Sequence, residues 1–189
     1  MYKKTLLASS IALLAFNLSH ATPEFDKAKS QLDTAYNALF SNFAYRGLRS
    51  DTNFAQKLAN FTAAMRNVEQ FVKTNNKGVL FGASSALEQA ANTLLSEDTK
   101  LKGTLLGIQN QLKQAEGLTP TKATMSFIDL GNLKERVKNA QNILRPKIND
   151  YTSTGQKEAW GLLIYALQIL HNSATIAHDQ LRDGGWLKK

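Results

Sequence analysis

Residues 154–182 read TGQKEAWGLLIYALQILHNSATIAHDQLR, and this stretch decides the fold. On a wheel with about 100° between residues, its apolar side chains fill three neighbouring sectors and leave only a narrow polar arc. A helix that is apolar over most of its circumference is typical of the middle of a bundle. We therefore expect residues 154–182 to form a central helix around which the rest of the chain packs. The polar arc holds Gly161, Gln168, Asn172, Thr175 and Asp179.

Four more stretches repeat their apolar residues at alternating steps of three and four, which is the spacing of one helix face. They cover residues 25–43, 54–72, 87–115 and 123–144. No segment alternates with a period of two for long enough to predict a strand. The sequence therefore predicts an all-α fold over residues 22–189. We expect a single-domain helical bundle of five or six helices, with the C-terminal helix central.

The stripe over residues 87–115 contains a charge in a core position. Asp98 occupies that position, where an unpaired carboxylate is costly. Either the helix breaks at Ser96–Thr99 or Asp98 reaches solvent or a basic partner, and we expect a break or kink. Gly103 and Gly107 lie four residues apart on the opposite side of the same stretch. Such a pair admits a close approach by another backbone, or it marks a local bend.

Residues 1–21 read MYKKTLLASSIALLAFNLSHA, which is the layout of a cleaved secretory signal peptide. Two lysines precede an apolar run of about eleven residues, which is shorter than the roughly 20 that span a bilayer. Ser19 and Ala21 are small residues at positions −3 and −1 of a cut before Thr22. We expect cleavage there and a location in a bacterial periplasm, or secretion beyond it. An uncleaved interfacial anchor is the alternative.

The composition narrows the classes of function. The chain has no cysteine, which excludes a disulfide scaffold, thiol chemistry and covalently attached haem. Its net charge is +8, and loss of Lys3 and Lys4 with the leader lowers this to +6. A basic exported protein meets anionic lipids and glycans in place of nucleic acid, so we expect no nucleic-acid partner. No nucleophile elbow, phosphate-binding loop or zinc-protease motif is present, and we do not expect an enzyme.

His171 and His178 are the two histidines that follow the leader, and both fall in the last predicted helix with Trp160 on their face. Seven residues separate the histidines by about 10.5 Å along a helix axis. One metal ion cannot bridge that gap, because metal–imidazole bonds are about 2.1 Å long. The sequence therefore predicts no metal site.

The pair His178 and Arg182, on the last helix of an exported bundle, resembles the haem-ligand helix of the b562-type cytochromes. In that family an axial methionine on the first helix completes the ligand set, whereas Met65 and Met125 here follow the first predicted helix. The resemblance covers two residues. It implies noncovalent haem, or another small hydrophobic ligand, in a pocket near His171, His178 and Trp160. We keep this carrier function as an alternative and expect no cofactor.

Lys134, Lys138 and Arg145 line one side of the fourth predicted helix. An anionic surface could dock there, and salt should weaken the contact; a solvated helix face explains the same residues. The sequence favours an exported, non-enzymatic binding or interaction protein of a bacterial periplasm or secretome. Its partner would be a protein or an anionic envelope surface. A membrane-surface-active bundle is a second alternative beside the ligand carrier.

Overall fold

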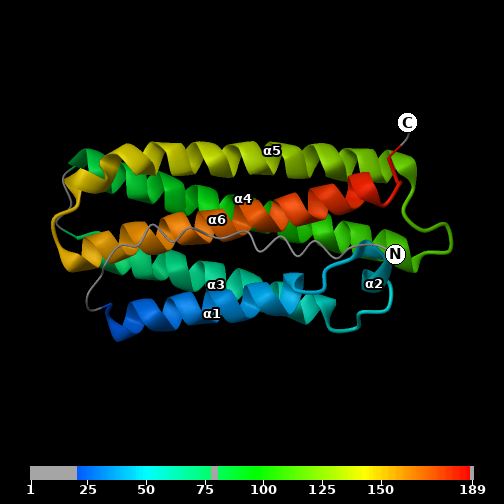
Figure 1. The fold of residues 1–189 in the computed structure, drawn as a ribbon, viewed down its shortest axis with the longest axis horizontal. Coiled ribbons are helices and arrows are strands. Elements are labelled where there is room, and N and C mark those ends of the chain that lie inside the picture. The colour runs from blue at the N-terminus through cyan, green and yellow to red at the C-terminus, as the bar shows by residue number, and fades with distance from the viewer. Residues whose placement is uncertain (1–20, 78–80, 188–189) are drawn as a thin grey trace, which may run out of the picture.

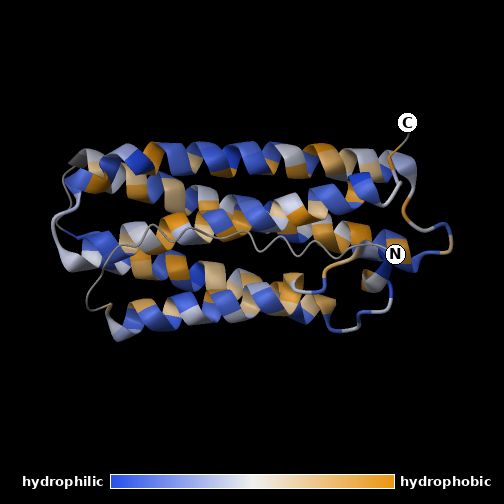
Figure 2. Ribbon diagram, in the orientation of Figure 1, coloured by the Kyte–Doolittle hydropathy of each residue, from blue (hydrophilic) through white to orange (hydrophobic). Residues whose placement is uncertain are grey.

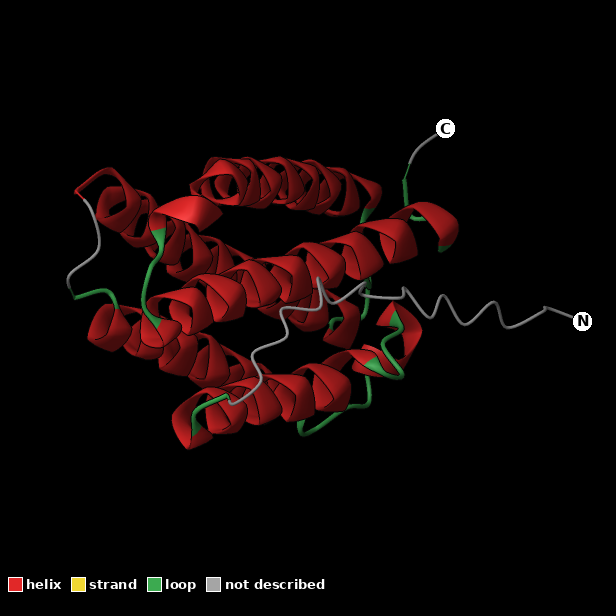
Figure 3. Cartoon of the chain, turned by 60° about the vertical axis from the view of Figure 1, so that its left-hand side comes forward, coloured by secondary structure: helices red, strands yellow, loops and turns green. Residues whose placement is uncertain are grey.

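The computed structural model describes residues 21–77 and 81–187, which form a bundle of antiparallel helices (Figure 1). Throughout these two ranges the chain contains no strand, as the uniform helix colour of Figure 3 makes plain. The predicted all-α bundle is thus confirmed, while residues 1–20 of the expected leader lie outside the described residues. The long helices are α1 (Pro23–Phe40), α3 (Phe54–Asn75), α4 (Phe81–Lys113), α5 (Pro120–Leu144) and α6 (Thr154–Asp183), with a short α2 (Tyr45–Leu48) and a 3-10 helix (Arg145–Asp150).

The last helix is central, as the sequence predicts. α6 contacts α1, α3, α4 and α5, and Figure 1 shows it between α5 on one side and α1 with α3 on the other. From Glu158 to Leu181 none of its residues is exposed. Its half-buried positions include Gln168, Asn172 and Thr175, which belong to the polar arc expected from the wheel. The apolar sectors of α6 therefore face the other helices, and the polar arc remains half-buried.

Three of the long helices begin at hydroxyl caps. The side chains of Thr22, Thr119 and Ser153 each accept a hydrogen bond from the backbone N–H three residues further on. Such caps satisfy donors that the first helical turn leaves unpaired. Pro23 and Pro120 follow the two threonines and hold the backbone angle that the first helical residue needs.

The expected break in the third stripe is wrong. α4 runs without interruption for 33 residues, and Asp98 lies inside it with 1% of its surface exposed. The neighbouring core positions Leu94 and Leu101 are both fully buried, so the helix is held against the bundle on either side of the charge. Burial raises the pKa of Asp98 to about 6, so the carboxyl group can take up a proton at a modest cost. Anchoring at Leu94 and Leu101, with the Thr62 hydroxyl and the charges of Lys102 and Arg66 near the carboxylate, explains why the helix continues.

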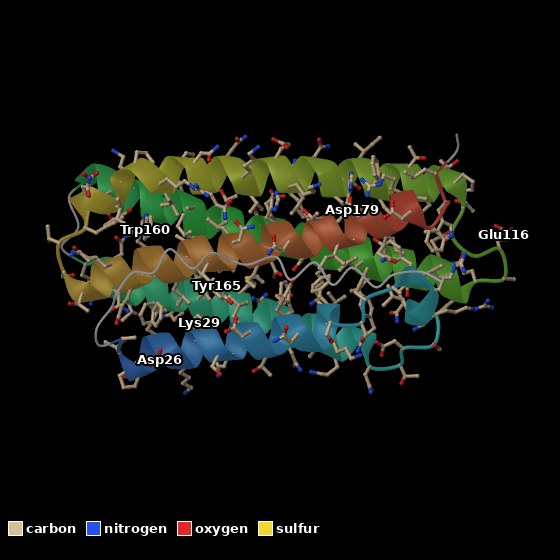
Figure 4. All side chains as sticks on the ribbon, viewed as in Figure 1. Asp26, Lys29, Glu116, Trp160, Tyr165 and Asp179 are labelled. Atoms are coloured by element: carbon tan, nitrogen blue, oxygen red, sulfur yellow. The ribbon has the colours of Figure 1, made fainter. Side chains whose placement is uncertain are left out.

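A cluster of polar side chains joins α1 to α6. Tyr165 donates a hydrogen bond to Asp33, and the Nζ atom of Lys29 lies 2.8 Å from the same carboxylate. The Lys29 ammonium also lies 4.8 Å from the centre of the Tyr165 ring, a cation–π arrangement. Figure 4 shows Lys29 and Tyr165 facing each other across the two helices.

Gly103 and Gly107 do not serve a close approach between backbones within the described chain. A Cβ atom added at either position would meet nothing within 4 Å. We therefore expect Gly103→Ala to raise the free energy of unfolding by about 0.5–1 kcal/mol, because glycine costs that much inside a helix. Gly184→Ala is the contrast, because its Cβ would overlap the Trp186 ring and should lower stability. Urea denaturation of both variants checks the pair; a loss of stability in Gly103→Ala would contradict the open site.

Candidate functional site

The outer side of α5 carries an exposed apolar surface. Met125, Ile128 and Ile143 are 55%, 55% and 48% exposed. Among the described side chains of residues 21–77 and 82–187 these are the only large apolar ones with such exposure, and all three belong to α5. Figure 2 shows hydrophobic positions scattered among hydrophilic ones along this outer helix. Met125 and Ile128 are neighbours on this helix, whereas Ile143 lies about 22 Å further along it. Adjacent exposed apolar side chains mark a contact surface more often than single ones do.

Of the predicted basic residues, Lys134 and Lys138 line another flank of the same helix, next to α6, and Arg145 follows as the first residue of the 3-10 helix. Lys134 is half-buried there, and Lys138 and Arg145 are exposed. Within residues 21–77 and 81–187 none of these three side chains forms an ion pair. Arg136, on the opposite flank, instead holds the buried Glu97 of α4 at 2.9 Å. The charges next to α6 are therefore available to an external anion.

His171 of α6 faces this basic row. Burial lowers the pKa of His171 below its usual value, and the positive charges of Lys134 and Lys138 lower it further. The Asn172 side chain and the Glu135 carboxylate act in the opposite direction. The Nδ1 atom of His171 is buried without a hydrogen-bond partner among the described residues. The structure thus brings His171 together with Lys134 and Lys138, two predicted sites that the sequence analysis had treated separately.

Amide side chains hold the two helices together beside this row. The Nε2 atom of Gln141 in α5 donates to the Oε1 atom of Gln168 in α6 over 3.2 Å. Gln168 in turn donates to the Oδ1 atom of Asn172 over 2.9 Å. The Gln141–Gln168 bond therefore joins α5 to α6, and the Gln168–Asn172 bond continues it along α6. We call Met125, Ile128 and Ile143, together with the basic row Lys134, Lys138 and Arg145, the α5 face.

His178 is engaged by a neighbouring aromatic ring. It stacks on Phe127 of α5, with 3.8 Å between ring centres and 25° between the planes. Its Nδ1 atom lies 3.1 Å from Asp179, which also lies 3.3 Å from Arg182. The His178 and Arg182 pair that resembles a haem-ligand helix is therefore bridged by Asp179, and one face of the imidazole is covered by Phe127.

Trp160 lies far from both histidines. It is buried near the start of α6, and its indole N–H donates to the carbonyl oxygen of Leu144 over 3.0 Å. Eighteen residues separate Trp160 from His178, which is about 27 Å along a helix. Figure 4 places Trp160 toward one end of α6 and Asp179, the neighbour of His178, toward the other. The structure does not bring Trp160, His171 and His178 into one pocket.

A shallow cavity of about 190 Å³ adjoins the apolar flank of the α5 face. It lies between α4 and α5, over Gly103 and Gly107, and Met125 and Lys122 form part of its wall. The space beside Gly103 and Gly107 is thus open to the surface next to the exposed side chain of Met125.

The described residues offer no evident metal centre and no membrane-spanning helix. In residues 21–77 and 81–187 no group of three or more His, Asp or Glu side chains is arranged to hold a metal ion. Across the same ranges, each helix is too short or too polar to cross a bilayer. Comparisons with protein-family models, curated proteins and solved structures give no match.

The apolar half of the α5 face was not predicted from the sequence, although its signal was present there. The predicted core stripe of this helix includes Phe127 and Leu130 and leaves Met125, Ile128 and Ile143 outside it. Apolar residues that fall off a helix's core stripe are either covered by another element or exposed. Which outcome applies depends on how the helices are arranged around α6. A helical wheel of α5 alone does not show that arrangement.

Proposed function

We propose that the chain is an exported, non-catalytic interaction protein that docks onto an anionic surface of the bacterial envelope through the α5 face. The observation that carries the proposal is the combination of three exposed apolar side chains on α5 with Lys134 and Lys138 of α5 and Arg145 of the adjoining 3-10 helix. These three basic side chains form no ion pair within residues 21–77 and 81–187. An interfacial helix binds an anionic membrane in this way, because apolar residues enter the headgroup region while Lys and Arg pair with phosphates.

Two further features support the proposal. The basic row lies beside His171, so the positive potential of α5 extends onto α6. The leader predicted for residues 1–21 would take the protein to a compartment where lipid phosphates and acidic glycans are abundant. The carrier alternative has no comparable support, because His178 is stacked on Phe127 and Trp160 is distant from it.

Sedimentation with lipid vesicles tests the proposal. Protein 22–189 should bind phosphatidylglycerol-containing vesicles, bind neutral phosphatidylcholine vesicles far less, and lose binding as salt is raised. The triple variant Lys134→Gln, Lys138→Gln, Arg145→Gln should bind the anionic vesicles about a hundredfold more weakly, since each basic side chain near such a surface contributes about 1 kcal/mol.

A second triple variant, Lys27→Gln, Arg49→Gln, Lys113→Gln, provides the matched control. These side chains are exposed and lie on other elements, and their loss changes the net charge by the same amount. The control should retain most of the affinity. If both triple variants weaken binding equally, net charge alone explains the effect and the α5 face is not the docking site. Equal binding to neutral and anionic vesicles would overturn the electrostatic docking.

A further inference from the structure

Glu158 of α6 is fully buried and accepts hydrogen bonds from Thr22, the residue that caps the start of α1. The backbone nitrogen of Thr22 donates to its Oε1 atom over 2.7 Å, and the Thr22 hydroxyl donates to its Oε2 atom over 2.9 Å. Both carboxylate oxygens are therefore bound by a single residue that lies 136 positions earlier in the chain. The same hydroxyl accepts the N–H of Phe25, so the cap of α1 and the contact with α6 share one side chain.

The charge of this carboxylate is not matched by a cation. Over residues 21–77 and 81–187, no Lys, Arg or His side chain forms an ion pair with Glu158. The start of α1 contributes only the partial positive charge of a helix N-terminus. A buried carboxylate is stable when it has both hydrogen bonds and a full opposite charge. In the uncleaved chain, Thr22 provides the hydrogen bonds from neutral donors.

The Thr22 nitrogen belongs to the peptide bond at which the leader is expected to end. Ser19 and Ala21 stand at the −3 and −1 positions of that bond. When an export peptidase hydrolyses it, water is added across the amide. Ala21 keeps the carbonyl carbon as a carboxylate, and the Thr22 nitrogen becomes an amine. An α-amine has a pKa of about 7.7–8.0, so it is largely a cationic ammonium at neutral pH.

We propose that Glu158 is the internal receptor for the α-ammonium group of Thr22, and that removal of the leader completes a buried ion pair between α1 and α6. The nitrogen already lies within hydrogen-bond distance of the carboxylate, so cleavage adds a charge without requiring a new contact. The processed chain is then more stable than the unprocessed one. This inference rests on the exported character in the proposed function and is independent of the α5 face.

A double-mutant cycle tests the ion pair. Protein 22–189 is released from a fusion that is cut directly before Thr22, and a second form retains Ala21. Each form is also prepared with Glu158→Gln, and all four are unfolded in urea. With Glu158 present, the form that begins at Thr22 should have an unfolding equilibrium constant about tenfold smaller than the form that retains Ala21. With Glu158→Gln the difference should vanish. Equal stability of the two Glu158 forms, or a difference that survives the substitution, overturns the ion pair.

Acylation of the α-amine provides a readout that needs no variant. In folded protein 22–189, the Thr22 amine should react with an amine-acylating reagent at least about tenfold more slowly than in the urea-unfolded protein. The exposed Lys113 is the control and should react alike in both states. A Thr22 amine that, like Lys113, reacts at the same rate in the folded and the unfolded protein contradicts the buried pair.

The mass of the exported protein tests the processing step separately. A mature chain that begins at Thr22 supports it, and a mature chain that begins at any other residue overturns it. Vesicle binding by protein 22–189 does not depend on either result, since the α5 face lies on different residues. Failure of the Thr22–Glu158 pair and failure of the α5 docking are therefore distinguishable.

Discussion

Leu167→Ala should lower the free energy of unfolding by about 3–4 kcal/mol, which is a large part of the stability of a domain of this size. Leu167 lies in the middle of α6 and is fully buried. Because α6 contacts all the other long helices, the cavity cannot close by movement of a single neighbour. The cost therefore includes both the lost burial of the side chain and the void that remains. Urea denaturation monitored by circular dichroism measures the change.

Ile164→Ala is the matched control for that substitution. Ile164 lies one turn earlier on α6 and is half-buried, so the gap left by its truncation opens toward solvent. We expect a loss of about 1–2 kcal/mol. Equal losses at the two positions would contradict the enclosed position of α6.

Asp98→Asn should raise the free energy of unfolding by about 2–3 kcal/mol at pH 7.5 and change it little at pH 4. Burial raises the pKa of Asp98 to about 6, and the nearby Thr62 hydroxyl, Lys102 and Arg66 oppose this only in part. Because the folded pKa lies above the unfolded value of 3.8, the protonated group favours folding. This contribution is complete below pH 3.8 and is lost as the pH rises through 6. A shift of about two pKa units corresponds to about 3 kcal/mol.

The test of Asp98 is the pH dependence of urea unfolding in the parent protein and the variant. The two curves should separate between pH 4 and pH 7. Glu97→Gln provides the contrast, because the buried Glu97 is paired with Arg136 and Lys100 and its neutralisation should destabilise the protein. A variant of Asp98 that loses stability at pH 7.5 would show that the carboxylate has a favourable partner in the folded state.

Helix positions followed from the sequence where a regular apolar stripe met a clear capping signal. The last helix was expected over residues 154–182 and spans Thr154–Asp183, because Ser153 caps its start and a glycine pair follows its end. The first stripe was expected to reach residue 43, but α1 ends at Phe40 and Phe43 is buried from the following loop. Burial alone therefore does not separate a helical residue from a loop residue that packs against the same core.

Asp98 shows where local reasoning is insufficient. An isolated carboxylate in a core position favours a break, and this expectation ignores both the raised pKa and the anchoring of α4 on either side. The contacts of Glu158 with Thr22 are a similar case, because the partners are 136 residues apart and meet only through the packing of α1 on α6. The apolar periodicity of one helix does not show whether a charged side chain is buried or which residue is its partner.

The candidate site was accessible from the sequence in part. Lys134, Lys138 and Arg145 share a flank because of their spacing, so the basic row could be identified before the fold was known. The association of this row with His171 required the antiparallel pairing of α5 and α6. Trp160 was grouped with the histidines because they share a helix face. That grouping left out the distance between Trp160 and the histidines along the helix axis.

Hydrogen exchange measured by mass spectrometry, with and without phosphatidylglycerol vesicles, tests both the central position of α6 and docking through α5. In the free protein, exchange should be slowest in α6 (Thr154–Asp183), because every other long helix covers it. On addition of vesicles, added protection should appear in α5 (Pro120–Leu144) and leave α1 and α3 unchanged. Fast exchange in α6, or vesicle-dependent protection that falls on α1 or α3 in place of α5, would contradict a bundle that is built around its last helix and binds through its outer one.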